Sequence, residues 1–182
     1  MSDVTAGTEV EPVEIELRDG RRVTLRAIRE DDADRLQEAI RGLSVESSYY
    51  RFFSAMPRLP AKLLERATRP EPERELQLVA VAGDGTHETI IGGARYAALT
   101  TAGDCEFAVA IVDEWHGLGL ARSLMEMLMR IARARGFQRM EGYVLTANSR
   151  MRDFAKRLGF AEMASSEGPT VRLVRRDLHP VP

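Results

Sequence analysis

The segment from residue 107 to 124 constrains the fold most strongly, because three different local patterns follow one another within it. It reads FAVAIVDEWHGLGLARSL. Its apolar start predicts a β-strand that ends near Val112, Gly117 and Gly119 predict a turn, and apolar residues from Leu120 onward recur at helical spacing. Free backbone N–H groups and the positive dipole end at the start of such a helix attract an anion, and glycines let the backbone approach it closely. The segment therefore predicts a strand, a turn and a helix that together bind an anionic group such as pyrophosphate.

Two nucleotide-binding motifs also place glycines between a strand and a helix, and both fit poorly here. A Rossmann fingerprint needs a third glycine where Arg122 stands, and it opens a series of βαβ units rather than following antiparallel strands. The Gly-x-x-x-x-Gly-Lys-Ser/Thr phosphate-binding loop is absent from the sequence. A glycine turn that only allows close packing stays open as the plain alternative.

The rest of the chain predicts mostly antiparallel strands with helices around them. Alternating apolar residues flank an Asp19-Gly20 turn, which is typical of a β-hairpin, and three apolar runs separated by turns predict a meander. Residues 1–12 show no periodicity, so we expect a flexible tail before a single domain over residues 13–182. The predicted strands are 13–17, 23–27, 76–82, 89–99, 105–112, 139–146, 160–163 and 170–177, and the predicted helices are 31–43, a second helical unit over 44–69, 120–135 and 149–158.

Charge and cysteine content disfavour several classes of protein. The chain has 26 basic and 28 acidic side chains, so its formal net charge of −2 offers no positive field for nucleic acid. Cys105 is the only cysteine, which excludes an internal disulfide and a Cys-rich zinc site, so we expect a reducing compartment and a cytoplasmic protein. The N-terminus lacks the pattern of a secretory signal, and no apolar run is long enough to span a membrane. His87, His116 and His179 are too far apart to suggest metal ligands.

Two motifs resemble those of the GNAT superfamily of N-acetyltransferases. The run from His116 to Ala121 resembles its Gln/Arg-x-x-Gly-x-Gly/Ala acyl-CoA motif, and the segment from Asn148 to Gly159-Phe160 resembles its second cofactor motif. The order of the predicted elements from residue 13 to 177 agrees as well. The resemblance implies an α/β (α+β) GNAT fold, with a mixed, mostly antiparallel central sheet, one splayed strand pair and flanking helices.

The same resemblance implies that acetyl-CoA is the co-substrate, with no metal. Backbone N–H groups of the glycine turn would hold the pyrophosphate, and the strand edge near Val109 and Ile111 would pair with the pantetheine arm. Asn148 would contact the cofactor near its pantetheine or phosphate end, and it also suits the N-cap of the following helix. The implied cofactor-binding residues are Val109, Ile111, Val112, His116, Gly117, Leu118, Gly119, Leu120, Ala121, Arg122 and Asn148.

A narrower resemblance concerns the acceptor. The sequence LSVESSYYRFF over 43–53, the sequence CEFAV over 105–109, and Met151 with Ala155 resemble bacterial protein lysine acetyltransferases. Those proteins are often fused to acyl-CoA-synthetase-like or cyclic-nucleotide-binding domains, and this chain matches their catalytic module alone. The implied acceptor is a protein lysine, with a small-molecule amine as the alternative, and a homo-oligomer is left open.

Glu106 is the predicted general base. A primary amine is protonated at neutral pH, so a carboxylate must remove a proton, directly or through water, before the amine attacks a thioester. Glu106 alternates with Ala108 and Ala110 on the strand that leads into the glycine turn, which places it on a face of small residues. In the lysine acetyltransferases that the chain resembles, the glutamate of this segment is the base. A solvent-facing strand glutamate is the plain alternative.

Several positions depart from the superfamily pattern. His116 stands where Gln or Arg is usual, Leu118 where Arg or Lys is common, and Ala155 where many members have a tyrosine that protonates the leaving thiolate. These departures keep a non-catalytic CoA-binding sensor open as an alternative function. Cys105 as a nucleophile and His116 as a base are weaker alternatives, since Cys105 alternates away from Glu106 and has no histidine close in sequence.

Overall fold

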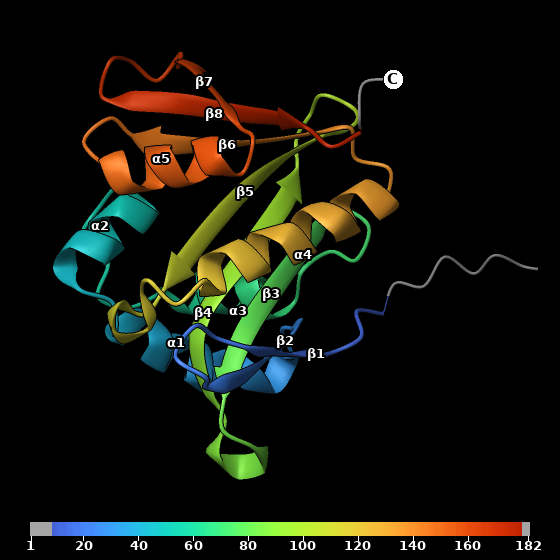
Figure 1. The fold of residues 1–182 in the computed structure, drawn as a ribbon, viewed down its shortest axis with the longest axis vertical. Helices are drawn as coiled ribbons and strands as arrows, with labels where there is room; N and C mark the ends of the chain where they lie inside the picture. Colours follow the sequence, from blue (N-terminus) through green and yellow to red (C-terminus); the bar gives the residue numbers. More distant parts are fainter. Residues whose placement is uncertain (1–8, 180–182) are drawn as a thin grey trace, which may run out of the picture.

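One open sheet of eight strands organises residues 9–179, the part of the chain that the computed structural model describes (Figure 1). The strand order is β1-β2-β3-β4-β5-β6-β8-β7. All neighbouring strands are antiparallel except β5 and β6, which are parallel. The strands are β1 (Val13–Glu16), β2 (Arg22–Ala27), β3 (Glu75–Ala82), β4 (Thr89–Ala98), β5 (Asp104–Ile111), β6 (Arg139–Leu145), β7 (Ala161–Ala164) and β8 (Val171–Asp177). The helices are α1 (Ala33–Arg41), α2 (Val45–Phe52), α3 (Ala61–Thr68), α4 (Leu120–Ala134) and α5 (Ser149–Arg157), with short 3-10 helices at Glu30–Asp32, Gly85–His87 and Asp113–Trp115.

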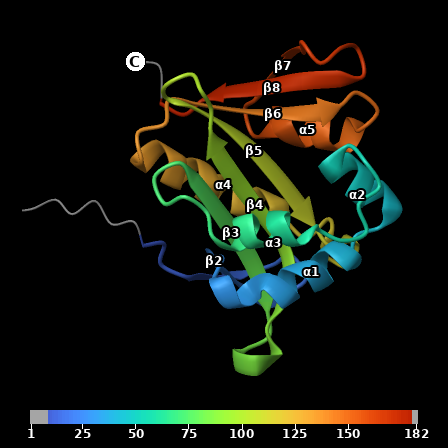
Figure 2. The ribbon, with the colours of Figure 1, turned by 180° about the vertical axis from the view of Figure 1, so that it is seen from behind.

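Helices cover both faces of this sheet (Figures 1 and 2). On one face, Leu124 and Leu128 of α4 and the buried Leu158 after α5 join strand residues in the larger core cluster. On the other face, Leu36 of α1 packs against a smaller buried cluster that includes Val79. Helix α3 lies beside α1 on this second face in Figure 2. The centre of the sheet is therefore buried on both sides.

Helix α4 forms because its apolar residues repeat at helical spacing. Leu120, Leu124 and Leu128 are one helical turn apart and are all buried. The helix ends at Ala134, and Gly136 follows with a φ of 89°, a left-handed conformation that glycine adopts without strain. The predicted helix and its glycine stop are thus confirmed.

The region between β2 and β3 differs most from the predicted elements. The predicted helix over 31–43 begins as one turn of 3-10 helix and continues as the shorter α1. The predicted helical unit over 44–69, with its helical stretch begun by Pro60, consists of two separate helices. Ser44 caps the start of α2 through its side chain, Phe53 ends it with a φ of 57°, and α3 begins only after Pro60.

The other predicted elements are present, and the α/β class with a mostly antiparallel sheet is confirmed. The hairpin around the Asp19-Gly20 turn is β1 and β2, and the meander is β3, β4 and β5. Residues 1–8 of the predicted tail over 1–12 lie outside the described residues. Among residues 9–179, no helix is both long and apolar enough to cross a membrane.

The parallel strands β5 and β6 separate after a short contact. They pair only over residues 104–106 of β5 and 139–141 of β6. Beyond this contact, no described strand pairs with the edge of β5 that faces β6. Figure 1 shows the two strands diverging, with the start of α4 near the open end of β5. The predicted splayed strand pair is present, and it leaves a gap in the middle of the sheet.

Candidate active site

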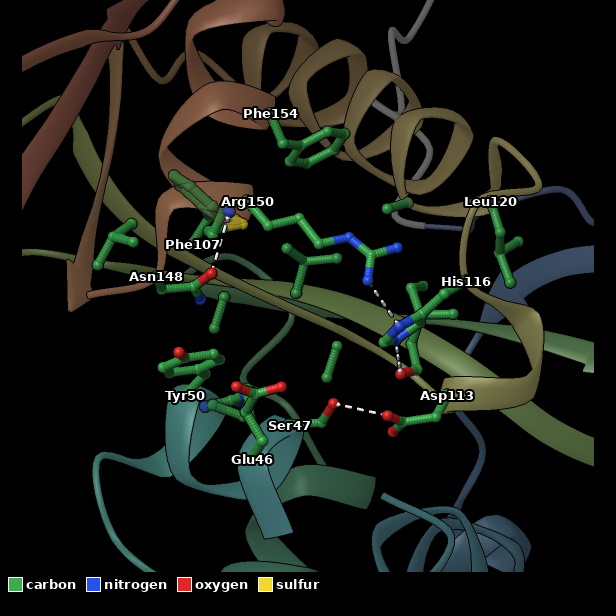
Figure 3. A pocket seen from close by; sticks show the side chains of 18 of the residues that line it. Glu46, Ser47, Tyr50, Phe107, Asp113, His116, Leu120, Asn148, Arg150 and Phe154 are labelled. Carbon is green, nitrogen blue, oxygen red and sulfur yellow. Dashed lines mark hydrogen bonds between the residues drawn. The ribbon is translucent and has the colours of Figure 1, made fainter. Parts of the chain in front are cut away.

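A cavity of about 1000 Å³ lies where β5 and β6 part (Figure 3). Its walls come from β5, the turn before α4, the start of α5 and helix α2. In Figure 3, Glu46 and Tyr50 of α2 lie on one side of it, and Asn148 and Arg150 at the start of α5 lie on the other. We call this cavity the cleft.

The turn between β5 and α4 contributes backbone donors to the cleft. Gly117 and Gly119 have φ values of 77° and 89°, which favour glycine. Gly119 is the N-cap of α4, and no side chain caps this helix start. The N–H groups of Leu120, Ala121 and Arg122 belong to the first helical turn, where no intrahelical acceptor exists. All five residues line the cleft, so the predicted anion-binding geometry is on its wall.

Cationic side chains surround this turn. The Arg18 guanidinium donates to the Gly117 carbonyl at 3.3 Å, and the Arg18 backbone N–H donates to the Leu118 carbonyl at 3.2 Å. Arg150 also lines the cleft, so positive charge adds to the helix dipole there. Arg122 lines the cleft too, but its guanidinium is paired with Glu126 at 2.8 Å. Leu118 does not line the cleft, because its side chain packs against the main core cluster.

Val109 and Ile111 lie on the free edge of β5. Backbone groups of alternate residues point to opposite edges of a strand. The Val112 N–H donates to the Ile91 carbonyl on the β4 side, so the backbone groups of Val109 and Ile111 point to the edge that β6 has left. Both residues line the cleft. Val112 does not, and its N–H is already used within the sheet.

His116 is held by two contacts within the cleft wall (Figure 3). Its Nε2 lies 2.8 Å from the Ile111 carbonyl oxygen, and its Nδ1 lies 3.3 Å from Nη1 of Arg150. A carbonyl can only accept, so Nε2 carries the proton and Nδ1 accepts from the guanidinium. The one lone pair that a neutral histidine could use as a base is therefore occupied.

Residues 9–179 also contain no group of three or more His, Cys, Asp or Glu side chains placed to hold a metal ion.

Asn148 is both a helix cap and a wall residue of the cleft. Its Oδ1 accepts from the Met151 N–H at 3.0 Å at the start of α5. The cap uses the oxygen and leaves the amide N–H₂ group for a ligand.

Further along α5, Ala155 is buried and contributes no acid. Tyr50 and Tyr143 line the cleft, and the sequence analysis did not single out either hydroxyl.

Glu106 lies at the last position where β5 pairs with β6, and the cleft begins there. It is half-buried, and its carboxylate has no hydrogen bond or ion pair to any of residues 9–179. Burial raises the pKa of Glu106, and the carboxylate of Glu141 on the neighbouring strand raises it further. Arg95 and Arg51 oppose this rise only in part. A free carboxylate with a raised pKa is well suited to accept a proton.

Cys105 is not available for chemistry in the cleft. It is fully buried and does not line the cavity, and its Sγ lies 3.5 Å from the Arg139 carbonyl oxygen. Burial raises the pKa of the thiol to about 12, so the thiolate is not populated at neutral pH. The nucleophile interpretation is therefore excluded by geometry and by protonation state.

The fold also brings together charged residues that the sequence analysis did not assign to the site. Arg175 donates to the buried Glu141 at 2.8 Å, beside Glu106 in the sheet. Arg95 on β4 lies 3.7 Å from Glu75, and Arg51 of α2 lines the cleft. These residues come from different elements, so no local spacing could have indicated that they meet.

Comparisons with known proteins agree with this arrangement. The model of a family described as an acetyltransferase (GNAT) domain matches residues 22–161. An acetyltransferase of Pseudomonas aeruginosa is 34% identical over 154 residues, which cover 85% of this chain and 83% of that protein. The GNAT domain of S. lividans PAT has a TM-score of 0.83 and 32% identity, covering 91% of this chain and 96% of that one. A cAMP-binding acyltransferase from Mycobacterium smegmatis has a TM-score of 0.63 and 25% identity, covering 93% of this chain and 48% of that one.

Proposed function

This chain belongs to the GNAT acetyltransferase family and is an N-acetyltransferase, and from that premise we propose that it transfers an acetyl group from acetyl-CoA to a primary amine, foremost a lysine side chain of a protein. One observation carries the proposal. The same cleft contains a glycine turn with free N–H groups, the unpaired edge of β5 and the free carboxylate of Glu106. These groups match the pyrophosphate, the amide-bearing arm and the thioester end of one long donor.

The donor would bind along the open edge of β5. The N–H groups from Gly117 to Arg122 would donate hydrogen bonds to the pyrophosphate oxygens, supported by the positive end of α4. The backbone of Val109 and Ile111 would pair with the amides of the pantetheine arm. Asn148 would donate from its amide group across the cleft. Binding through backbone groups also explains why His116 and Leu118 are tolerated where other side chains are usual.

Glu106 would act as the general base. It accepts a proton from the ammonium form of the acceptor, the amine nitrogen then bonds to the acetyl carbon, and the carbon–sulfur bond of the thioester breaks. After the attack the nitrogen still carries one proton too many, and it releases this proton through water or a hydroxyl of the cleft to the thiolate that leaves. The products are then the amide, the free thiol of CoA and the proton held by Glu106. A lysine amine has a pKa of about 10.4, so a base with a raised pKa is better matched to it than an ordinary carboxylate.

The protein-lysine acceptor rests on one relative. The GNAT domain of S. lividans PAT, a protein acetyltransferase, matches nearly the full length of this chain at 32% identity. In this proposal residues 13–182 act as one catalytic domain. We place the activity in the cytoplasm, because the single cysteine is typical of proteins in a reducing compartment.

The first test combines donor binding with loss of the base. Acetyl-CoA at about 100 times its dissociation constant should stabilise the wild type by about 2.7 kcal/mol, or about 5 to 10 °C in Tm, and NADH at the same concentration should not. Glu106→Gln should keep this thermal shift and lower kcat about 10² to 10⁴-fold, because it retains shape but cannot accept a proton.

The exposed Glu73 supplies the matched control. Glu73→Gln makes the same chemical change outside the cleft and should keep both the shift and the rate. Equal acetylation rates for the Glu106 and Glu73 variants would contradict the base assignment. Absence of a shift with acetyl-CoA in the wild type would contradict the donor site.

A further inference from the structure

A second cavity of about 310 Å³ adjoins the cleft on the face of the sheet that α1 and α3 cover. Arg51, Phe52, Ala108 and Ala110 line both cavities, so the two meet at the boundary between α2 and β5. Glu106 lines the cleft two residues before Ala108 on the same strand. The second cavity, which we call the side chamber, therefore begins next to the proposed base.

Small residues of the sheet create the side chamber. Gly93 pairs with Ala110, and Arg95 pairs with Ala108, so these four residues lie on one face of β4 and β5. Apolar residues of α1 and α3 form the opposite wall, among them Leu36. The chamber thus has mostly apolar walls and is large enough for a short carbon chain.

The charged residues of the side chamber all have the same sign. Three arginines line it, Arg51, Arg66 and Arg95, and no acidic residue of 9–179 does. Arg66 is neutralised by Glu75 at 2.9 Å, while Arg95 reaches the same carboxylate only at 3.7 Å. One carboxylate therefore serves two guanidinium groups, and the chamber has excess positive charge.

Arg51 has the fewest partners of the three. None of residues 9–179 accepts a hydrogen bond from its guanidinium or forms an ion pair with it, and its contact is with the Phe52 ring at 4.8 Å. Burial lowers the pKa of Arg51 to about 10, and repulsion from Arg95 adds to this effect while Glu106 opposes it. A half-buried cation without a counterion has lost solvation that an anionic ligand would restore.

We propose that Arg51 and Arg95 form a carboxylate-binding subsite for the acceptor, so that the preferred amine carries a carboxylate that can reach these guanidinium groups while the amine lies beside Glu106, and a carbon chain that enters the side chamber. The inference rests on the proposed function, because it assigns specificity to the same cleft. Guanidinium groups bind carboxylates through paired, charge-assisted hydrogen bonds, which gives both affinity and orientation. The amine would then be held beside Glu106 by a contact that takes no part in proton transfer.

A carboxylate beside an amine has two sources, and matched acceptor pairs distinguish them. The first pair is a lysine peptide with glutamate next to the lysine and the same peptide with glutamine there. The second pair is free leucine and leucinamide, which differ only in the carboxylate. We would measure kcat/KM for each acceptor at saturating acetyl-CoA, and the affinity of each acceptor for the CoA-bound protein by calorimetry.

The variants separate charge from packing. The wild type should prefer the carboxylate member of at least one pair by about 10- to 100-fold, the range for a hydrogen bond to a charged group. Arg51→Gln should lower kcat/KM for the carboxylate member more than for the neutral member, so that the preference is lost, and Arg51→Lys should restore part of the preference. Arg58→Gln, a change at an exposed arginine that lines neither cavity, should keep the preference.

The outcomes distinguish this inference from the proposed function. Acetylation of both members of each pair with equal kcat/KM would overturn the subsite and leave the acetyltransferase proposal standing. Equal loss for both members in Arg51→Gln would overturn it as well. Arg51-dependent binding of the carboxylate member without any acetylation would support the subsite and contradict the proposed reaction. Neither turnover nor carboxylate-dependent binding would overturn both.

Discussion

At the scale of single residues, one face of the sheet carries a row of charges beside the cleft. Glu106, Glu141 and Arg175 are cross-strand neighbours on β5, β6 and β8. Arg175 donates to Glu141 at 3.0 and 2.8 Å, and this ion pair joins the buried Glu141 to a partly exposed arginine. The proposed base therefore depends on a carboxylate that is held in place and is not part of the cleft lining.

Replacing that neighbour should move the pH dependence of the reaction. Burial is the main cause of the raised pKa of Glu106, and the charge of Glu141 adds to it. Glu141→Gln removes the added repulsion, so the pKa of Glu106 should fall. Because the base must be ionised, the rise of kcat/KM with pH should shift to lower pH, as a pH–rate profile would measure.

Glu162 offers a control for the loss of an arginine-paired glutamate. Glu162 is on β7, which pairs with the edge of β8 that faces away from β6. Its carboxylate accepts hydrogen bonds from Arg152 of α5 and Arg172 of β8, and it does not line the cleft. Glu162→Gln should leave the acid limb of the profile where the wild type has it. An acid limb that stays unchanged in Glu141→Gln, or moves to higher pH, would rule out the proposed coupling.

The sequence predicted site residues where one continuous segment supplies them. Glu106, Gly117 and Gly119 follow from strand alternation and turn chemistry over a few residues, and all three line the cleft. Arg51 and Arg95 could not be found in this way, because Arg51 is on α2 and Arg95 on β4, and they line one chamber only when α2 packs against the sheet. Site residues that depend on tertiary packing leave no periodic signal in a single sequence.

At the scale of elements, local chemistry decides which boundaries the sequence can predict. The strand, turn and helix around Gly119 are predicted well because a positive-φ glycine and a regular apolar repeat both act within a few residues. The segment over 44–69 is predicted less well. Its break into α2 and α3 depends on a serine cap, a left-handed Phe53 and Pro60, which compete with a helical pattern of apolar residues.

Substitution of a glycine in the turn should cost the same stability as substitution of a comparable glycine elsewhere, but it should weaken acetyl-CoA binding more. Gly119 and Gly136 both have a φ of 89°, at the start and just beyond the end of α4, and a Cβ at either would meet no atom closer than 3.8 Å. Alanine at either position should therefore cost a similar amount, about 1 to 3 kcal/mol of backbone strain. Thermal unfolding would measure this common loss.

Acetyl-CoA affinity should separate the two glycine variants. Gly119→Ala changes the backbone of the proposed pyrophosphate site and should weaken acetyl-CoA binding at least about tenfold, whereas Gly136→Ala should bind as the wild type does. Calorimetric titration at a temperature where both variants are folded would test this. Equal affinities would mean that the turn serves packing alone.

At the scale of the whole molecule, a buried ion cluster joins the first helical layer to the sheet. Asp32 is fully buried and accepts from Arg26 of β2 at 2.7 and 2.9 Å. Arg35 of α1 and the Arg29 backbone N–H complete its hydrogen bonds, and Glu88 before β4 also binds Arg26. One network of ion pairs therefore joins β2 and α1, which precede β3 in the chain, to Glu88, which follows it.

This cluster should make stability sensitive to acid. Burial alone would raise the pKa of Asp32, but hydrogen bonds from Arg26 and the Arg29 N–H outweigh it and lower the pKa below its ordinary value. The stabilisation is present above the unfolded-state pKa of about 3.9 and is lost as pH falls through the lower folded-state pKa. Asp32→Asn should cost about 3 to 5 kcal/mol at pH 7, since it leaves Arg26 without its main partner.

Urea unfolding at several pH values would measure this loss. The difference in unfolding free energy between the wild type and Asp32→Asn should shrink below about pH 4. Asp31→Asn, a change at the exposed neighbouring residue, should differ little from the wild type at any pH. A difference for Asp32→Asn that is the same at pH 3 and pH 7 would be inconsistent with the assigned ion cluster.

The short contact between β5 and β6 also determines how a long ligand reaches its site. Strands β1 to β5 form one half of the sheet, and strands β6, β8 and β7 form the other. The two halves pair at only three positions, and beyond these positions no described strand bridges the gap. A channel closed on all sides would require a flexible chain to be threaded from one end. In this gap one side-chain contact, between Arg150 of α5 and His116, joins the two sides. Once this contact parts, a linear molecule can enter laterally and leave by the same route, without breaking a backbone hydrogen bond of either half of the sheet.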